Sequence, residues 1–159
     1  MTGPAQQAST TDPAAKARIV VGVDDTPQAR HALQWAQFMA VALNAEIDAI
    51  AAWEITAVEA EEWSDDIHPE SETATQLHTI VTDALGAQPQ VLIREMISHG
   101  PPADELVKAS EGAQMLVVGS RGHRGLHELL MGSVSSTSAT RARCPVLTIH
   151  GETPPPPAR

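Results

Sequence analysis

Met115-Leu116-Val117-Val118-Gly119-Ser120-Arg121-Gly122, followed after nine residues by Gly132-Ser133, is the stretch that decides the fold. Its first four residues are all apolar, which is typical of a parallel-sheet strand buried on both faces. Glycines after such a strand let the backbone come close to a ligand. A serine where the next helix begins adds a hydroxyl beside amide groups without partners inside the helix. The stretch therefore predicts a site for an anion, and a nucleotide phosphate is the first candidate.

Strand and helix signals alternate along the rest of the chain. Apolar runs predict strands, and apolar stripes at helical spacing predict the helices between them. This alternation predicts an α/β fold, a doubly wound five-stranded parallel sheet with helices on both faces and right-handed crossovers. The predicted strands are 18–24, 46–52, 91–97, 115–119 and 146–150, and the predicted helices are 26–44, 74–86, 101–112 and 132–141.

The two ends of the chain differ in composition from the middle. Residues 1–17 are rich in Ala, Thr, Gln and Pro without periodicity, and we expect a disordered N-terminal arm. Residues 151–159 contain four consecutive prolines, and we expect a solvated, extended proline-rich tail without a partner. The α/β domain is thus expected to span residues 18–150. Within it, residues 59–72 are predicted to form an acidic linker.

Charge and composition exclude several classes of protein. A net charge of −10 argues against binding to nucleic acid or to an anionic membrane, because both call for a basic surface. No apolar run approaches the roughly 20 residues of a membrane span, and we expect no signal peptide because no apolar stretch follows a basic start. The single cysteine, Cys144, cannot form an internal disulfide and fits a reducing compartment. A cytoplasmic location is therefore expected.

The glycine pattern is similar to a known family signature. Gly119, Gly122 and Gly132-Ser133 are spaced as Gly-x2-Gly-x9-Gly-Ser, which resembles the ATP-binding signature of the universal stress protein family. Residues 20–24 with Thr26 resemble that family's opening Val-Gly-Val-Asp-Gly-Ser, and residues 143–147 resemble its closing Cys-Pro-Val-Leu strand. The resemblance covers roughly residues 19–150. The pattern is neither a P-loop, which has Lys before Ser or Thr, nor the Rossmann glycine motif.

The resemblance implies ATP bound at the carboxyl ends of the strands, and frequent homodimers. In this sequence, Asp24 would contact the adenosine part and the backbone near Ala52 would read the adenine edge. Gly119 and Gly122 would line the path of the ribose and phosphates. The phosphates would be held by the start of the last helix, namely Gly132, Ser133 and the N–H groups of Val134 and Ser135.

Several residues depart from the family pattern or extend it. Asp25 stands where the family usually has glycine, and its charge near phosphates requires a cation, so Asp25 is predicted to act through Mg²⁺. Arg121 and His123 lie in the glycine loop and can donate to phosphate. The last helix is rich in Ser and Thr at 133–140, where the family carries apolar residues, so loose packing is expected.

Two histidine and acidic groups have alternative readings. His123 and His127 are four residues apart, as metal ligands on a helix are, but nearby glycines make helix unfavourable and solvated loop residues are the better interpretation. The acidic group Asp65, Asp66, His68 and Glu70 suggests a divalent ion, and a solvated acidic loop is again favoured.

Three functions stay open from the sequence. The protein can be a regulatory protein that retains ATP, a slow ATP-hydrolysing enzyme, or an interaction module that has lost the nucleotide. The intact glycines favour the first two, and the missing P-loop lysine, water-activating base and arginine finger disfavour efficient turnover, so no catalytic residue is assigned. A homodimer is predicted through the strand at 146–149, which is short, apolar and expected at a sheet edge.

Overall fold

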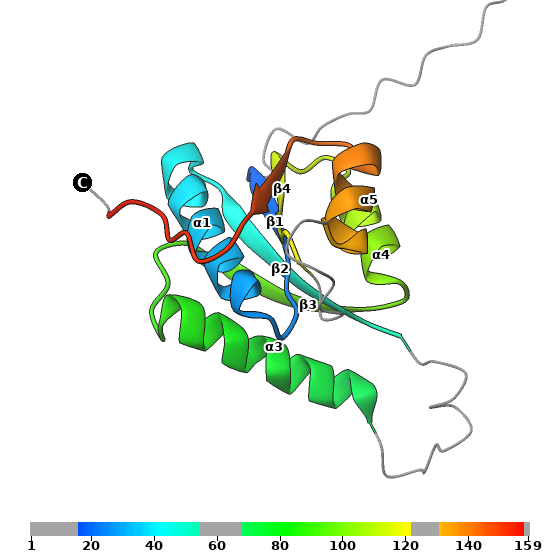
Figure 1. Ribbon diagram of the computed structural model, residues 1–159. Coiled ribbons are helices and arrows are strands. Elements are labelled where there is room, and N and C mark those ends of the chain that lie inside the picture. Colours follow the sequence, from blue (N-terminus) through cyan, green and yellow to red (C-terminus); the bar gives the residue numbers. More distant parts are fainter. Residues whose placement is uncertain (1–15, 55–67, 122–130, 158–159) are drawn as a thin grey trace, which may run out of the picture.

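The computed structural model describes residues 16–54, 68–121 and 131–157 (Figure 1). In this part of the chain, strands and helices alternate as the sequence predicts. The elements are β1 (Arg18–Gly22), α1 (Pro27–Leu43), β2 (Glu46–Trp53), α3 (Pro69–Leu85), β3 (Ile93–His99), α4 (Pro102–Ala109), β4 (Met115–Gly119), α5 (Ser133–Arg141) and β5 (Val146–Ile149).

The five strands form one parallel sheet in the order β3-β2-β1-β4-β5. From β1 the chain builds outward to β3 on one side, then returns to place β4 on the other side of β1 and β5 outside β4. The order therefore reverses between β1 and β4, which is where ligands bind in open sheets of this type. The predicted five-stranded α/β fold is confirmed.

Helices cover both faces of the sheet (Figure 1). On one face α1 and α3 pack over a core that includes Ile19, Val21 and Ile47. On the other face α4 and α5 pack over Val20 and Leu116, the alternate residues of the same strands. This explains why β1 and β4 read as unbroken apolar runs: both sides of each strand are buried.

The helix ends follow local signals. Thr26 is the N-cap of α1 and Pro27 its first residue, while Asn44 ends it in the left-handed conformation with φ 51° and ψ 46°. The acidic linker was predicted too long, because α3 already begins at Pro69. Proline suits a first helical position, and Glu70 and Glu72 lie in the first turn where negative charge is favourable. Residues 59–67 of that linker lie outside the described residues.

The last helix, α5, is held by polar contacts on its inner side. Its buried residues are Ser135 and Ser138 rather than apolar side chains. The hydroxyl of Ser135 donates to the carbonyl oxygen of Gly119, at the end of β4. The Ser138 hydroxyl is fully buried and no hydrogen-bond partner for it is found in the part of the chain that the structure describes. The serine-rich helix thus packs against the sheet at some cost in stability.

The described helices include none that is long and apolar enough to cross a membrane.

The two buried serines of α5 provide a matched pair of variants. Ser138→Ala removes an unsatisfied buried hydroxyl and improves helix propensity, so we expect stabilisation by about 1 kcal/mol, or about 2–4 °C in Tm. Ser135→Ala removes a hydroxyl that has a partner and leaves the Gly119 carbonyl without it, so we expect it to lower Tm. Thermal unfolding followed by circular dichroism measures the Tm of both variants. A Ser138→Ala variant with a lower Tm than wild type contradicts the conclusion that the Ser138 hydroxyl has no hydrogen-bond partner.

Candidate functional site

The predicted site residues come from strand ends that meet at one edge of the sheet. β1 ends at Gly22, and Asp24 and Asp25 follow directly. β4 lies beside β1 and ends at Gly119, with Ser120 and Arg121 after it. Because all five strands are parallel, their carboxyl ends share this edge. The site therefore falls at the point where the strand order reverses.

Asp24 shapes the turn between β1 and α1. Its Oδ1 accepts a hydrogen bond from the backbone N–H of Thr26 at 3.0 Å and another from the Thr26 hydroxyl. The Thr26 hydroxyl donates to Asp24, and its oxygen accepts no hydrogen bond from the amides of α1. These bonds engage one carboxylate oxygen of a half-buried residue. Asp24 has a structural role that the sequence analysis did not foresee.

The backbone of Ala52 points into the space beyond the end of β1. In β2, the N–H of Glu46 donates to Ala17 and the carbonyl of Ile50 accepts from Val23, so alternate residues face β1. Ala52 is the next residue in this series. β1 has already turned away there, and no backbone partner for Ala52 on that side is found within the described residues. Its N–H and C=O are thus directed past the end of β1, and its contact with an adenine edge stays a prediction.

Gly119 is required by packing between α1 and β4. A Cβ at this position would lie 2.9 Å from the Cβ of Gln28, in the first turn of α1. Gly22 is similar, since its Cβ would lie 2.6 Å from a methyl carbon of Leu106 in α4. Both glycines let a helix approach the end of a central strand closely. This explains Gly119 without a ligand, whereas the sequence analysis assigned it to the ribose and phosphate path.

The start of α5 is tied to the end of β4. The N–H of Gly132 donates to the carbonyl of Ser120 at 2.9 Å, and Ser135 donates its hydroxyl to Gly119. The first hydrogen bond of the helix runs from the N–H of Ser136 to the carbonyl of Gly132 at 3.0 Å. Residues 133–135 lie between Gly132 and Ser136, and their N–H groups have no acceptor inside the helix. They are the predicted phosphate ligands Ser133, Val134 and Ser135.

Gly132 and Ser133 differ in what they offer a ligand. Gly132 has φ −60° and ψ 161°, an extended conformation that any residue adopts, so backbone strain does not require glycine there. Ser133 is exposed, so its hydroxyl is accessible. Of the glycine loop, Arg121 is described and exposed, whereas Gly122, His123 and His127 lie outside the described residues.

An ionised group lies close to the Ala52 end of the sheet. Ser98 is paired with Ala52 in the register of β2 and β3, and its hydroxyl donates to Glu105 of α4. Hydrogen bonds from Lys108, at 2.6 Å, and then from Ser98 hold the pKa of Glu105 below its ordinary value. Glu105 is therefore a carboxylate at neutral pH, and its charge is balanced by Lys108.

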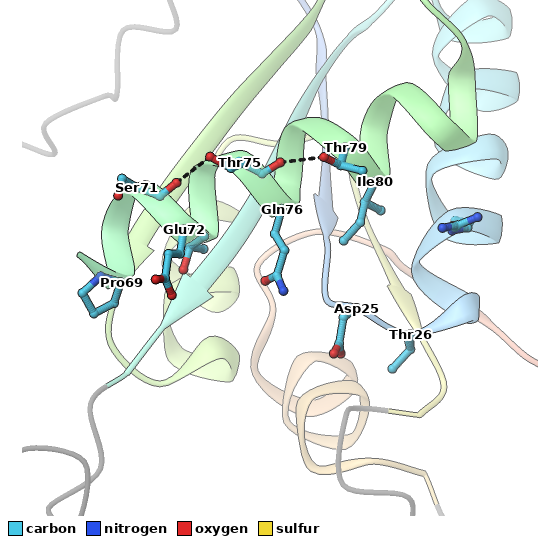
Figure 2. A pocket seen from close by; sticks show the side chains of 11 residues that line it. Asp25, Thr26, Pro69, Ser71, Glu72, Thr75, Gln76, Thr79 and Ile80 are labelled. Carbon is cyan, nitrogen blue, oxygen red and sulfur yellow. Dashed lines mark hydrogen bonds between the residues drawn. The ribbon is translucent and has the colours of Figure 1, made fainter. Parts of the chain in front are cut away.

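A pocket of about 690 Å³ lies between the turn after β1 and residues 69–80 of α3 (Figure 2). Figure 2 shows the Gln76 side chain extending from α3 toward the turn that carries Asp25 and Thr26. Of the predicted site residues that the structure describes, only Asp25 lines this pocket. A second pocket of about 650 Å³, lined by Trp53 and Ile97 among others, shares Pro69 and Ser71 with it.

The sequence analysis missed the contribution of α3. Ser71, Thr75 and Thr79 recur at four-residue spacing and line one side of the first pocket. The Thr75 and Thr79 hydroxyls each donate to the carbonyl four residues earlier, at 2.9 Å, as the dashed lines in Figure 2 show. Their protons are committed, so they meet a ligand mainly as acceptors. The four-residue spacing of Ser71, Thr75 and Thr79 was the signal in the sequence that could have indicated this polar side of α3.

A metal site built by protein groups alone does not occur in residues 16–54, 68–121 and 131–157. No group of three or more His, Cys, Asp or Glu side chains able to hold a metal is found there. Asp25 is exposed at the rim of the larger pocket. A cation at Asp25 would therefore need ligand oxygens to complete its shell. Asp65 and Asp66 lie outside the described residues.

Comparison with known proteins finds relatives of this chain. Residues 17–150 match the model of the universal stress protein family. Universal stress protein Rv2623 of Mycobacterium tuberculosis is 34% identical over 135 residues, which cover 83% of this chain and 44% of that protein. The chain thus spans about half the length of the first curated relatives it matches.

Solved structures of similar proteins share the fold. A universal stress protein crystallised in complex with cAMP is 28% identical, with a TM-score of 0.60, and the match covers 86% of this chain and 98% of that one. The universal stress protein from Archaeoglobus fulgidus is 23% identical, with a TM-score of 0.61, and the match covers 84% and 93%. The fold defines a parallel α/β protein with helices on both faces of a five-stranded sheet. The chain belongs to the universal stress protein family.

Proposed function

We propose that this protein binds a nucleotide, ATP with Mg²⁺, at the edge where β1, β2 and β4 end. The observation that carries the proposal is the start of α5, where the amides of Ser133, Val134 and Ser135 precede the first helical hydrogen bond. Three such amides at a helix N-terminus form a favourable place for phosphate, because the helix dipole and the N–H groups act together. Ser133 adds an exposed hydroxyl.

The adenosine part fits the neighbouring strand ends. The N–H and C=O of Ala52 face the crevice beyond β1, and a backbone donor and acceptor in that arrangement match the edge of an adenine ring. Asp24 is held beside them by Thr26, within reach of a ribose. The cAMP complex of a 28% identical relative supports an adenine nucleotide. The choice of ATP rests on the glycine spacing and that of Mg²⁺ on the carboxylate of Asp25.

We further propose a regulatory role in the cytoplasm, with nucleotide retained and little turnover. Hydrolysis requires a general base held beside a positioned nucleophile. Among the described residues at the strand ends, no polar side chains form such a pair. A slow ATPase and a nucleotide-free interaction module are the alternatives. Each makes a different prediction for the experiment that follows.

Gly132→Val tests the phosphate site. Because φ −60° and ψ 161° are open to valine, the backbone at 132 tolerates the change, and a loss of affinity reports the ligand. We expect wild type to bind Mg²⁺-ATP in calorimetry and the variant to lose binding at least tenfold with an unchanged circular dichroism spectrum. Gly122→Val is the companion variant from the same loop, and Ala87→Val, at an exposed position after α3, serves as a control away from the site.

Equal affinity in both loop variants contradicts the phosphate assignment. Absence of heat together with no co-purified nucleotide supports the interaction module. Turnover above about 1 s⁻¹, the low end of ordinary enzyme rates, supports the enzyme.

Asp25→Ala tests the metal. A carboxylate near phosphates repels them unless a cation lies between, so the variant should lose most of the Mg²⁺ dependence of ATP affinity. The measurement is a set of ATP titrations with and without Mg²⁺, with Asp25→Asn as the isosteric companion. Tighter ATP binding by the variant under every condition means that Asp25 only repels phosphate.

A homodimer through β5 is also proposed. β5 is the last strand at its edge of the sheet. Pro145 and Ile149 direct their carbonyls to β4, so Val146 and Thr148 direct their N–H and C=O groups outward. Ile149 itself is 4% exposed and belongs to the core beside α1. The interface would therefore form through the outward backbone of β5, which is open to a second copy of the strand.

Thr148→Pro tests this interface with little effect on the fold. Proline removes an N–H that points away from β4, which an edge strand tolerates. We expect wild type to be dimeric and Thr148→Pro monomeric in light scattering at equal concentration, while Thr148→Ala stays dimeric. A dimeric Thr148→Pro variant places the interface elsewhere.

A further inference from the structure

The segment after β5 does not leave the molecule but turns back onto α1. Gly151 has φ 58°, a left-handed conformation that favours glycine, and the Thr153 hydroxyl donates to the carbonyl of His150 at 3.1 Å. This turn directs residues 151–157, here called the proline segment, across α1, as Figure 1 shows in red. The composition of this segment predicts a solvated tail without a partner, and its contact with α1 corrects that prediction.

One hydrogen bond ties the proline segment to α1. The indole N–H of Trp35 donates to the carbonyl of Thr153 at 2.7 Å, between residues 118 positions apart in the chain. Thr153 directly precedes the four prolines. Prolines have no N–H, so a proline run pairs poorly with strands or helices and offers its carbonyls to outside donors. A side chain such as tryptophan, which only donates, is the matching partner.

The surface under the segment is aromatic in a chain with few aromatic residues. Trp35 packs edge-on against Phe38, with ring centroids 5.8 Å apart and planes at 79°. These are one of three tryptophans and the single phenylalanine of the chain. Both are half-buried, and Pro155 is half-buried while the prolines on either side of it are exposed. Tryptophan beside another aromatic ring is the surface that proline-rich segments bind in general.

We propose that Trp35 and Phe38 form a binding site for a proline-rich peptide, and that residues 151–157 of the same chain are its resident ligand. The site lies on the outer side of α1, away from the strand-end crevice. It is independent of nucleotide binding, so either proposal can fail without the other. The indole N–H of Trp35 and the two aromatic rings define the ligand that fits: an extended segment with a free carbonyl directly before a run of prolines.

The test uses full-length protein in which Pro154 to Pro157 are all replaced by serine. Each of the three tryptophans gives one indole N–H signal in a ¹⁵N spectrum, and Trp35→Phe identifies that of Trp35. We expect the serine variant to shift the Trp35 signal and not that of Trp53. A peptide of residues 150–157, added to the variant, should return the signal toward its wild-type position in a saturable way.

Two controls make the result specific. Trp35→Phe in the serine variant should lower the affinity for the peptide by about three- to tenfold, which is the effect of losing one neutral hydrogen bond. Trp53→Phe should leave that affinity unchanged. The wild-type chain should not respond to the peptide, because its own segment occupies the site. An unchanged Trp35 signal in the serine variant, equal peptide affinity in Trp35→Phe, or equal binding by wild type each overturns the proposal.

Discussion

The close approach of α1 to the end of β4 is the contact on which the site depends. Gly119 has no Cβ, and the first turn of α1 occupies that space, with the Gln28 Cβ 2.9 Å from where one would lie. The contact brings the Asp24 turn beside the end of β4. A larger residue at 119 would push α1 outward and separate the two strand ends. Gly22 allows the same approach by Leu106 of α4 on the opposite face.

The polar character of α5 follows from its position in this arrangement. The helix must begin at Gly132, close to β4, and its inner side meets the backbone carbonyl of Gly119. A serine at 135 satisfies that carbonyl, which an apolar residue cannot do. The consequence is a helix of low propensity with a buried, unsatisfied hydroxyl at Ser138. The Ser135 contact thus ties the helix to the end of β4, at a cost in stability that arises at Ser138.

The helix α1 serves three separate purposes through three of its sides. Its first turn defines the strand-end crevice, and its inner face, with Ala32 and Ala36 fully buried, packs on the sheet. Small alanines allow the close packing that α1 needs. Its outer side carries Trp35, which holds the segment after β5. Trp35 therefore lies at the edge of the core, whose buried apolar side chains are aliphatic, and contacts the segment from there.

The sequence by itself determined the alternation of strands and helices, and with it the parallel sheet and the edge at which its strands end, because apolar periodicity and helix-end residues such as Pro27 and Asn44 are local signals. It also indicated α5 as the place for an anion. Only the tertiary structure decided that the first turn of α1 leaves no space for a Cβ at position 119, and that Asp24 accepts hydrogen bonds from Thr26. It also decided that Ile149 lies in the core and that the indole of Trp35 donates to the carbonyl of Thr153. Except for the Asp24 turn, these depend on residues far apart in the chain, whose meeting is set by helix packing and strand order rather than by local pattern.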